Sequence, residues 1–276
     1  MESNKPEEKV LYYGDYLQLN NILNAQKPIV RPGATGPPEH EQMLFIIVHQ
    51  TYELWFKQVL HELDSITDIL SHPILDDNSP QMQTVVDRLK RINTILRVLV
   101  HQIDIVETLT PMQFLQFRNL LVPSSGFQSW QFKLIDARLG LVEEQRHGLN
   151  YYISVLREED IQKIREAEAK PTLLKLFGEW LERMPFFNAE FWGGQIGEEI
   201  PPEQHPFWTE WERNYDESLR ENEKSNLERF RKVMFSEKRG EHCQLSAKAC
   251  RSALFISAYQ LYPILSQPFA FLQELL

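Results

Sequence analysis

The sequence predicts an all-α fold, and three observations support that prediction. Apolar residues recur at helical spacing along most of the chain, and the apolar–polar alternation typical of strands is nearly absent. The 16 prolines and 11 glycines fall at joints between the periodic stretches. With 276 residues, 42% of them hydrophobic, the chain can bury a substantial core. We therefore expect a single multi-helix domain over residues 1–276.

Taken in order, the helical spacing predicts a short helix over 10–24 and then a loop over 28–38, where prolines and glycines cluster. A long helix is expected over 40–71, and its first half is apolar on nearly every face, as in a buried helix. A loop rich in glycine and proline is expected over 186–206. The other expected helices cover 80–108, 111–122, 125–146, 172–184, 207–239 and 245–262, with a last one from 267.

Charge and composition exclude several classes of partner. The net charge of −10 repels phosphate backbones and anionic lipids, so we expect neither nucleic acid nor membrane as a partner. The polar start of the chain, residues 1–9, does not resemble a signal or transit peptide. Cys243 and Cys250 fall two turns apart on a helical pattern, too far for a bridge along one helix. These features predict a cytoplasmic protein.

The charged stretch 209–241 is typical of a solvated helix face with ion pairs at i,i+4 spacing. Phosphate loops, nucleophile elbows and dinucleotide-binding fingerprints are absent from the sequence, which excludes kinases, hydrolases and nicotinamide enzymes. The histidines form no zinc-binding pattern; they are His40, His49, His61, His72, His101, His147, His205 and His242.

The first candidate site lies in the long apolar helix. Helical spacing places Phe45, His49, Tyr52 and Phe56 on one face. An imidazole in such surroundings needs a partner, because burying it unsatisfied is costly. Spacing alone favours a core histidine with a hydrogen-bond partner, and a ligand-binding histidine is the functional alternative.

The second candidate begins at Thr110, where Thr110, Pro111 and Gln113 together predict a capped helix start. Phe114 and Arg118 then share a face of this helix, and no acidic residue lies within four positions of Arg118. Its guanidinium therefore reaches the surface, pairs with a distant carboxylate, or binds the carboxylate of a ligand in an apolar cavity.

Two further segments allow either a structural or a functional interpretation. The junction 123–126, Pro-Ser-Ser-Gly, can face an anion or a cofactor edge, or can be an ordinary turn between helices. The three tyrosines Tyr12, Tyr13 and Tyr16 can staple a helix, or can dock on another subunit.

Several of these segments together resemble tryptophan 2,3-dioxygenases. The resemblance rests on Tyr13-Gly-Asp-Tyr16-Leu, on residues 43–63 (MLFIIVHQTYELWFKQVLHEL), on Phe117-Arg118, and on residues 123–129 (PSSGFQS). Looser matches follow at residues 235–242, at Ser246 and at residues 268–272. The order and the approximate separation of the segments also match, so the likeness covers essentially the whole chain.

The resemblance implies an all-helical, cytosolic homotetramer with one haem b per subunit. Enzymes of this family open the pyrrole ring of L-tryptophan with O2 and form N-formyl-L-kynurenine, the first step of tryptophan catabolism. Haem supplies the reaction with O2, and the protein supplies orientation and excludes water. No external electron donor is needed, which agrees with the missing nucleotide motifs.

The resemblance also implies roles for individual residues. His49 would face the indole N–H on the distal side of the haem, Phe114 would pack against the substrate, and Arg118 would take its carboxylate. Tyr13 and Tyr16, in an N-terminal arm and loop over 1–38 at the subunit interface, would close the pocket of a neighbouring subunit. The remaining implied contacts are Phe45, Ile46, Ile47 and Val48 along the indole and Ser125 and Gly126 along the haem edge.

The sequence departs from the family pattern at its C-terminal end. The family's proximal haem histidine, and a threonine that helps to hold the substrate ammonium, come after the segment that ends at Leu276. The metal ligand is therefore unknown, since His242 lies upstream of the family position, and we expect the C-terminal part of the family domain to be missing. Two alternatives remain: a haem-free aromatic amino-acid-binding or interface protein, and a related haem oxygenase for tyrosine or another aromatic. The match around His49 and Arg118 favours tryptophan.

Overall fold

The structure is a computed structural model, and it describes residues 11–33, 35–72, 75, 79–141, 154–237 and 244–258. The chain divides into two compact units. Unit 1 contains residues 1–57 and 94–129, and unit 2 contains residues 58–93 and 130–276. The prediction of one domain over the whole chain stays a prediction.

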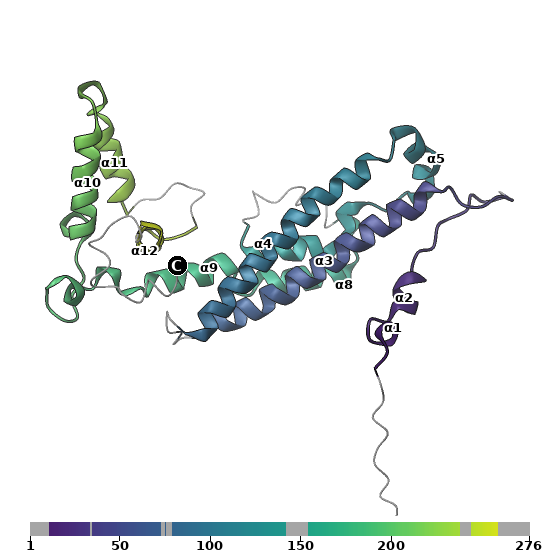
Figure 1. The fold of residues 1–276 in the computed structure, drawn as a ribbon, viewed down its shortest axis with the longest axis horizontal. Helices are drawn as coiled ribbons and strands as arrows, with labels where there is room; N and C mark the ends of the chain where they lie inside the picture. Colours follow the sequence, from purple (N-terminus) through teal and green to yellow (C-terminus); the bar gives the residue numbers. More distant parts are fainter. Residues whose placement is uncertain are drawn as a thin grey trace, which may run out of the picture. The chain divides into compact units, whose positions relative to one another are not determined.

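The described residues are helical with almost no extended structure, which confirms the predicted fold class. Two long helices, α3 (Glu41–Leu70) and α4 (Pro80–Glu107), each contribute one part to unit 1 and one part to unit 2 (Figure 1). Unit 1 also contains α1 (Tyr13–Tyr16), α2 (Leu19–Leu23), α5 (Pro111–Leu121) and the 3-10 turn η1 (Gly126–Gln128). Unit 2 adds α6 (Trp130–Leu139), α8 (Glu158–Glu168), α9 (Leu173–Glu182), α10 (Pro206–Ser218), α11 (Asn226–Met234) and α12 (Ala247–Ala258).

In unit 1, side-chain hydrogen bonds join α3 to α4. The Tyr52 hydroxyl donates to the carbonyl of Leu99 over 2.7 Å, and Gln102 Nε2 donates to the carbonyl of Val48 over 3.2 Å. Val48 and Leu99 are themselves buried, at 4% and 6% exposure. A buried amide must find a partner, so these bonds also fix how the two helices face each other.

The start of α5 confirms the predicted helix cap. Thr110 accepts a hydrogen bond from the backbone N–H of Gln113, and the Gln113 side chain accepts one from the backbone N–H of Thr110. Gln113 Nε2 also donates to Glu41 on α3 over 3.2 Å. The cap therefore links the first turn of α5 to the first turn of α3.

In unit 2, a buried carboxylate joins the other parts of the long helices. Glu62 on α3, 3% exposed, lies 2.8 Å from Arg91 and 3.6 Å from Arg88, both on α4. Burial by itself raises the pKa of Glu62, but hydrogen bonds from Arg91 and Gln58, together with the positive charges of Arg91 and Arg88, outweigh it, and the pKa is lowered. The charged form therefore persists at neutral pH and holds the two helices together.

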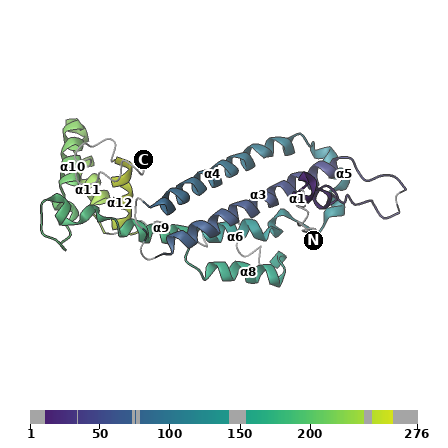
Figure 2. The ribbon, with the colours of Figure 1, turned by 60° about the horizontal axis from the view of Figure 1, so that its bottom comes forward.

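The rest of unit 2 packs in pairs of helices, with α6 against α8 and α9 against α12 (Figure 2). An aromatic cluster forms its core between the 3-10 turn Pro185–Phe187, α10 and α12. The rings of Phe186 and Phe255 stack at 5.0 Å, and Phe207 lies 4.4 Å from Phe255. Such ring pairs each add about 1 kcal/mol beyond the area that they bury.

The predicted helix over 207–239 is wrong, because the chain turns back on itself there (Figure 1). The helices α10 and α11 form a hairpin around the turn η6 (Glu221–Glu223). Lys224 pairs with Asp216 at 2.7 Å and Arg231 pairs with Glu212, so these ion pairs join α11 and the turn to α10. Only the weaker pair Arg213–Glu217, at 4.0 Å, has the predicted i,i+4 spacing within this hairpin as described.

Other boundaries also differ from the prediction. The helix over 10–24 is divided at Gln18, whose φ of 53° lies in the left-handed region. The helix over 125–146 ends at Gly140, because a φ of 98° cannot continue a helix. The helix α8 was not expected. The loop over 186–206 contains 3-10 turns at Pro185–Phe187, Ala189–Trp192 and Pro202–Gln204 and one antiparallel bridge between Asn188 and Glu199.

The expectation that the first half of α3 is buried on every face is also wrong for the single chain. Met43, Ile47 and Leu54 are exposed by 42%, 45% and 55%. The sequence shows that these side chains are apolar, but it does not show whether the folded chain covers them. They stay exposed because unit 1 packs on only part of the surface of α3.

None of the described helices is long and apolar enough to cross a membrane. Several predictions fall on residues that the structure does not describe. These are the last helix from 267, the looser family match at 268–272, His147, His242 and Cys243.

Candidate functional site

Four side chains predicted on two different helices come together in unit 1. Phe45 and His49 on α3 have ring centroids 4.1 Å apart, and Phe45 stacks on Phe114 of α5 at 5.7 Å with 27° between the ring planes. Phe117 closes the group edge-on, 5.7 Å from Phe45 and 5.4 Å from Phe114, and is fully buried. The cluster thus presents Phe45, His49 and Phe114 over a rigid aromatic base.

The hydrogen bond of His49 determines which of its ring nitrogens is available. His49 Nδ1 lies 2.7 Å from the carbonyl oxygen of Phe45, one turn earlier on α3. A carbonyl only accepts, so Nδ1 carries the hydrogen and donates it. In the neutral ring Nε2 then has a lone pair and no hydrogen. His49 is exposed, so this nitrogen can accept an N–H from a ligand.

The expectation that Arg118 is enclosed in an apolar cavity is wrong for the single chain. Arg118 is exposed, and the described residues provide it with neither an ion pair nor a hydrogen bond. It follows Phe114 by one turn on α5, so the two side chains share a face. Phe114 is half-buried against Phe45 and Phe117 is fully buried, so the packed side of α5 ends at these two rings and the Arg118 side chain lies outside it.

The Ser125–Gly126 junction forms the predicted capped turn. Ser125 accepts from the backbone N–H of Phe127 at 3.3 Å, and its own N–H donates to Gln128 at 3.1 Å. A Cβ placed on Gly126 would meet nothing within 4 Å, and the neighbouring Phe127 is 41% exposed. The junction therefore offers an open, partly apolar edge.

The remaining predicted contact residues differ from one another in how far their side chains are exposed. Tyr13 and Tyr16 are each 70% exposed. Ile46 is half-buried and Ile47 is exposed, so both present surface to a ligand. Val48, in contrast, is buried, and little of its side chain remains for one.

Two residues that fix this site were not singled out from the sequence. Gln42 is 2% exposed on α3, and it hydrogen-bonds both backbone polar groups of Ile29. Arg31 donates to the carbonyl of Gln116 on α5. A signal for Gln42 existed, since it is an uncharged polar residue one turn before Phe45 in an apolar helix. No local pattern distinguishes Arg31.

Outside the cluster, the buried histidine of unit 2 is engaged on both nitrogens. His205 Nε2 donates to the Phe186 carbonyl at 3.0 Å, and Nδ1 accepts from the Phe207 N–H at 3.2 Å. Burial lowers its pKa to about 4, although the bond to Phe186 acts in the opposite direction. No group of three or more metal-binding side chains exists among the described residues.

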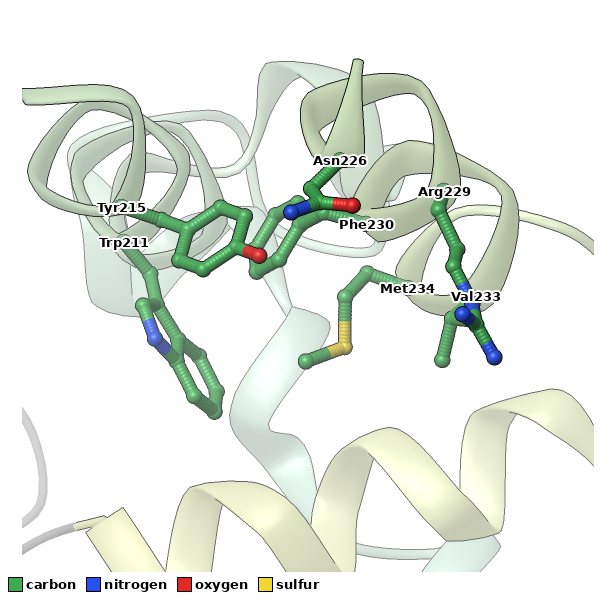
Figure 3. A pocket seen from close by; sticks show the side chains of 7 residues that line it. All are labelled: Trp211, Tyr215, Asn226, Arg229, Phe230, Val233 and Met234. Carbon is green, nitrogen blue, oxygen red and sulfur yellow. The ribbon is translucent and has the colours of Figure 1, made fainter. Parts of the chain in front are cut away.

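A hollow of about 600 Å³ lies in unit 2 on the α10–α11 hairpin (Figure 3). Trp211, Tyr215, Phe230 and Met234 form its apolar wall, and Asn226 and Arg229 lie at its rim. None of the predicted site residues lines it. The candidate site is therefore the α3–α5 cluster.

Comparison with known proteins gives one family. A sequence model described as tryptophan 2,3-dioxygenase matches residues 2–276. The chain is 40% identical to tryptophan 2,3-dioxygenase from Dictyostelium discoideum, over 97% of this chain and 70% of that protein. It is 40% identical to the protein of that name from Alteromonas mediterranea, over 96% of this chain and 76% of that protein. Tryptophan 2,3-dioxygenase B from Danio rerio is 37% identical, over 99% of this chain and 70% of that protein.

These relatives carry the name of the enzyme, and they come from both eukaryotes and bacteria. The match also extends over nearly all of this chain, so it includes both α3 and α5. The alternative of a haem-free binding protein gains no support from them. The chain belongs to the tryptophan 2,3-dioxygenase family.

Proposed function

We propose that this chain is a haem-dependent dioxygenase that opens the indole ring of L-tryptophan with O2 and forms N-formyl-L-kynurenine. The observation that carries the proposal is the pairing of Phe45, His49 and Phe114, with His49 Nε2 left as an acceptor. An indole is a flat apolar ring with one N–H donor, so its chemistry complements this group. Family membership gives the proposal its reaction.

Each residue of the site has a role in this proposal. Phe45 and Phe114 stack against the indole, and His49 Nε2 accepts the indole N–H, which orients the ring. Arg118 takes the substrate carboxylate, because its planar fork matches two carboxylate oxygens and it has no competing partner among the described residues. The protein contributes orientation, because the ring contacts and His49 fix the indole end of the amino acid and Arg118 fixes its carboxylate end.

The Ser125–Gly126 turn supports a place for the edge of a haem. The open side of Gly126, with Phe127 and Val122 exposed by 41% and 70%, suits the edge of a flat apolar macrocycle. The described residues supply no axial ligand that we assign, and the buried His205 already uses both of its ring nitrogens. When bound, haem supplies the activation of O2, which indole does not react with directly.

We further propose that the enzyme works as a homotetramer in the cytoplasm. Besides the exposed apolar positions on α3, unit 1 exposes Val100 by 65%, Ile103 by 48% and Met112 by 73%. Apolar surface of this extent is typical of a protein interface, and like chains most often assemble symmetrically. Tyr13 and Tyr16 then close the site of a neighbouring copy and cover Arg118 and His49 from solvent. The size of the assembly is measurable by light scattering after gel filtration, and a monomer would contradict the assembly.

The decisive experiment measures binding and turnover in the same preparation. The chain is purified with added hemin, its absorption spectrum is recorded with and without L-tryptophan, and N-formyl-L-kynurenine is measured by chromatography. We expect a haem spectrum that shifts on addition of L-tryptophan, and product that depends on O2. A spectrum identical to that of free hemin, with no product, would overturn the proposal.

Variants of Arg118 test its assignment separately. Arg118→Ala is expected to weaken L-tryptophan binding by about tenfold to a hundredfold, as for loss of a charged hydrogen bond. Arg118→Lys should recover only part of this loss, because an ammonium cannot bind two carboxylate oxygens in parallel. Arg165→Ala, on the exposed surface of α8, is the matched control. Unchanged affinity in Arg118→Ala would remove Arg118 from the site.

A further inference from the structure

We propose that Gln42 is a positioning residue of the site. It holds residues 25–31, here called the strap, across the two helices that carry the site. This inference rests on the proposed function for its effect on the substrate, although the strap itself can be tested without any activity. Gln42, Gln50 and Arg31 make the contacts that define the strap.

The Gln42 side chain makes the backbone hydrogen bonds of the strap that a neighbouring strand would otherwise make. Its Oε1 accepts from the N–H of Ile29 at 2.8 Å, and its Nε2 donates to the carbonyl of the same residue at 3.0 Å. The side chain is 2% exposed, so water cannot take over either bond without opening the packing. One buried amide therefore satisfies both polar groups of Ile29, in the way that a neighbouring strand would.

Further bonds fix the two ends of the strap. At its start, Gln26 Nε2 donates to Gln50 Oε1 at 2.6 Å, and Gln50 Nε2 donates to the Ala25 carbonyl at 3.4 Å. At its end, Arg31 Nη2 donates to the carbonyl of Gln116. The strap is thus attached to α3 at two positions and to α5 at one.

These attachments lie directly beside the site residues. Gln42 precedes Phe45 by three positions and Gln50 follows His49, so both α3 attachments flank the site residues of that helix. Gln116 lies between Phe114 and Arg118 on α5. The spacing between the α3 and α5 site residues therefore depends on the strap as well as on the packing of Phe117.

The strap also carries the N-terminal arm. The helices α1 and α2 lie immediately before it, and they contact each other while their side chains stay largely exposed. Fixing residues 25–31 determines where the chain leaves α3 and α5 toward Tyr13 and Tyr16. Loss of Gln42 should therefore weaken substrate binding in two ways. The site residues on α3 and α5 would be held less firmly, and so would Tyr13 and Tyr16 on the arm.

The test compares the holoenzyme of wild type with Gln42→Met, which keeps the length of the side chain and removes both hydrogen bonds. Hydrogen exchange of the Ile29 amide is expected to become about tenfold faster or more. In the same variant the KM for L-tryptophan should rise about tenfold, while kcat stays within about twofold of wild type. Gln162→Met is the matched control, because Gln162 is exposed on α8 and bonds only to Glu166 in the described residues.

A second variant keeps the test valid if Gln42→Met folds poorly. Arg31→Met removes an exposed side chain that bonds to a carbonyl, and it should raise KM with little change in kcat. Unchanged Ile29 exchange in Gln42→Met, or a fall in kcat with constant KM in either variant, overturns the inference. If wild type lacks turnover, the proposed function fails by itself, and the Ile29 exchange still decides whether Gln42 holds the strap.

Discussion

Protonation of the buried His205 is expected to destabilise the fold as the pH falls from 6.5 to 4. The imidazole is fully buried, its Nε2–H donates to the Phe186 carbonyl, and its Nδ1 accepts the Phe207 N–H. A proton added at Nδ1 would point at the Phe207 N–H, from which Nδ1 now accepts a hydrogen bond. That bond caps the start of α10, and it would be lost. The rings nearest to the imidazole are Phe187, Trp192 and Phe255, none of which ionises to compensate the charge.

The size of the effect follows from the pKa. Burial lowers the pKa of His205 from 6.5 to about 4, so between these values the unfolded chain binds a proton that the folded chain does not. The contribution of neutral His205 to the free energy of unfolding is therefore fully present above pH 6.5, and it is lost as the pH falls toward 4. The free energy involved is about 3 kcal/mol, and below pH 4 this contribution stays constant.

The assay is urea unfolding followed by tryptophan fluorescence at several pH values between 4 and 7.5. His205→Asn removes the titration and keeps a side-chain acceptor for the helix start. We expect this variant to be less stable than wild type at pH 7.5, and the difference to shrink by about 3 kcal/mol toward pH 4. His101→Asn, at an exposed position, should show a difference that hardly changes. A difference between wild type and His205→Asn that is independent of pH would refute the reasoning.

Three other variants test the packing around the site and in unit 2 by urea unfolding. Phe117→Ala should cost about 3–5 kcal/mol, because it empties the base of the aromatic cluster, and a loss below about 1 kcal/mol would contradict that role. Gly140→Ala should cost about 1–3 kcal/mol, since the φ of 98° disfavours a side chain and the new Cβ would lie 2.8 Å from Thr172 Oγ1; wild-type stability would show that the turn relaxes. Glu62→Gln should cost about 2 kcal/mol at pH 7, a modest value because its partner Arg91 is 54% exposed. Because the pKa of Glu62 is lowered, this difference should stay at pH values above the ordinary glutamate pKa of 4.5 and be lost as the pH falls through the lower pKa of the folded chain; a constant difference would contradict the ion pair.

Predictions that depend on neighbouring residues in the sequence were the most accurate. The cap at Thr110 was predicted because a hydroxyl, a proline and an amide at fixed spacing satisfy the first N–H groups of a helix, and those groups are all local. The long helices over 41–70 and 80–107 follow from periodic apolar residues. The hairpin at 206–234 was missed because the charged residues suit one long helix or two shorter ones equally well.

The sequence by itself determined the helical class and the family, and it predicted His49, Phe114 and Arg118 as groups that one amino-acid ligand would satisfy. Only the tertiary structure decided that Phe45 stacks on Phe114, which hydrogen bond fixes the His49 tautomer, and that Gln42 holds Ile29. It also decided that Arg118 is exposed in the single chain. The physical reason is range: helix formation and capping depend on residues within about four positions, whereas ring stacking and burial depend on which surfaces the folded chain brings together.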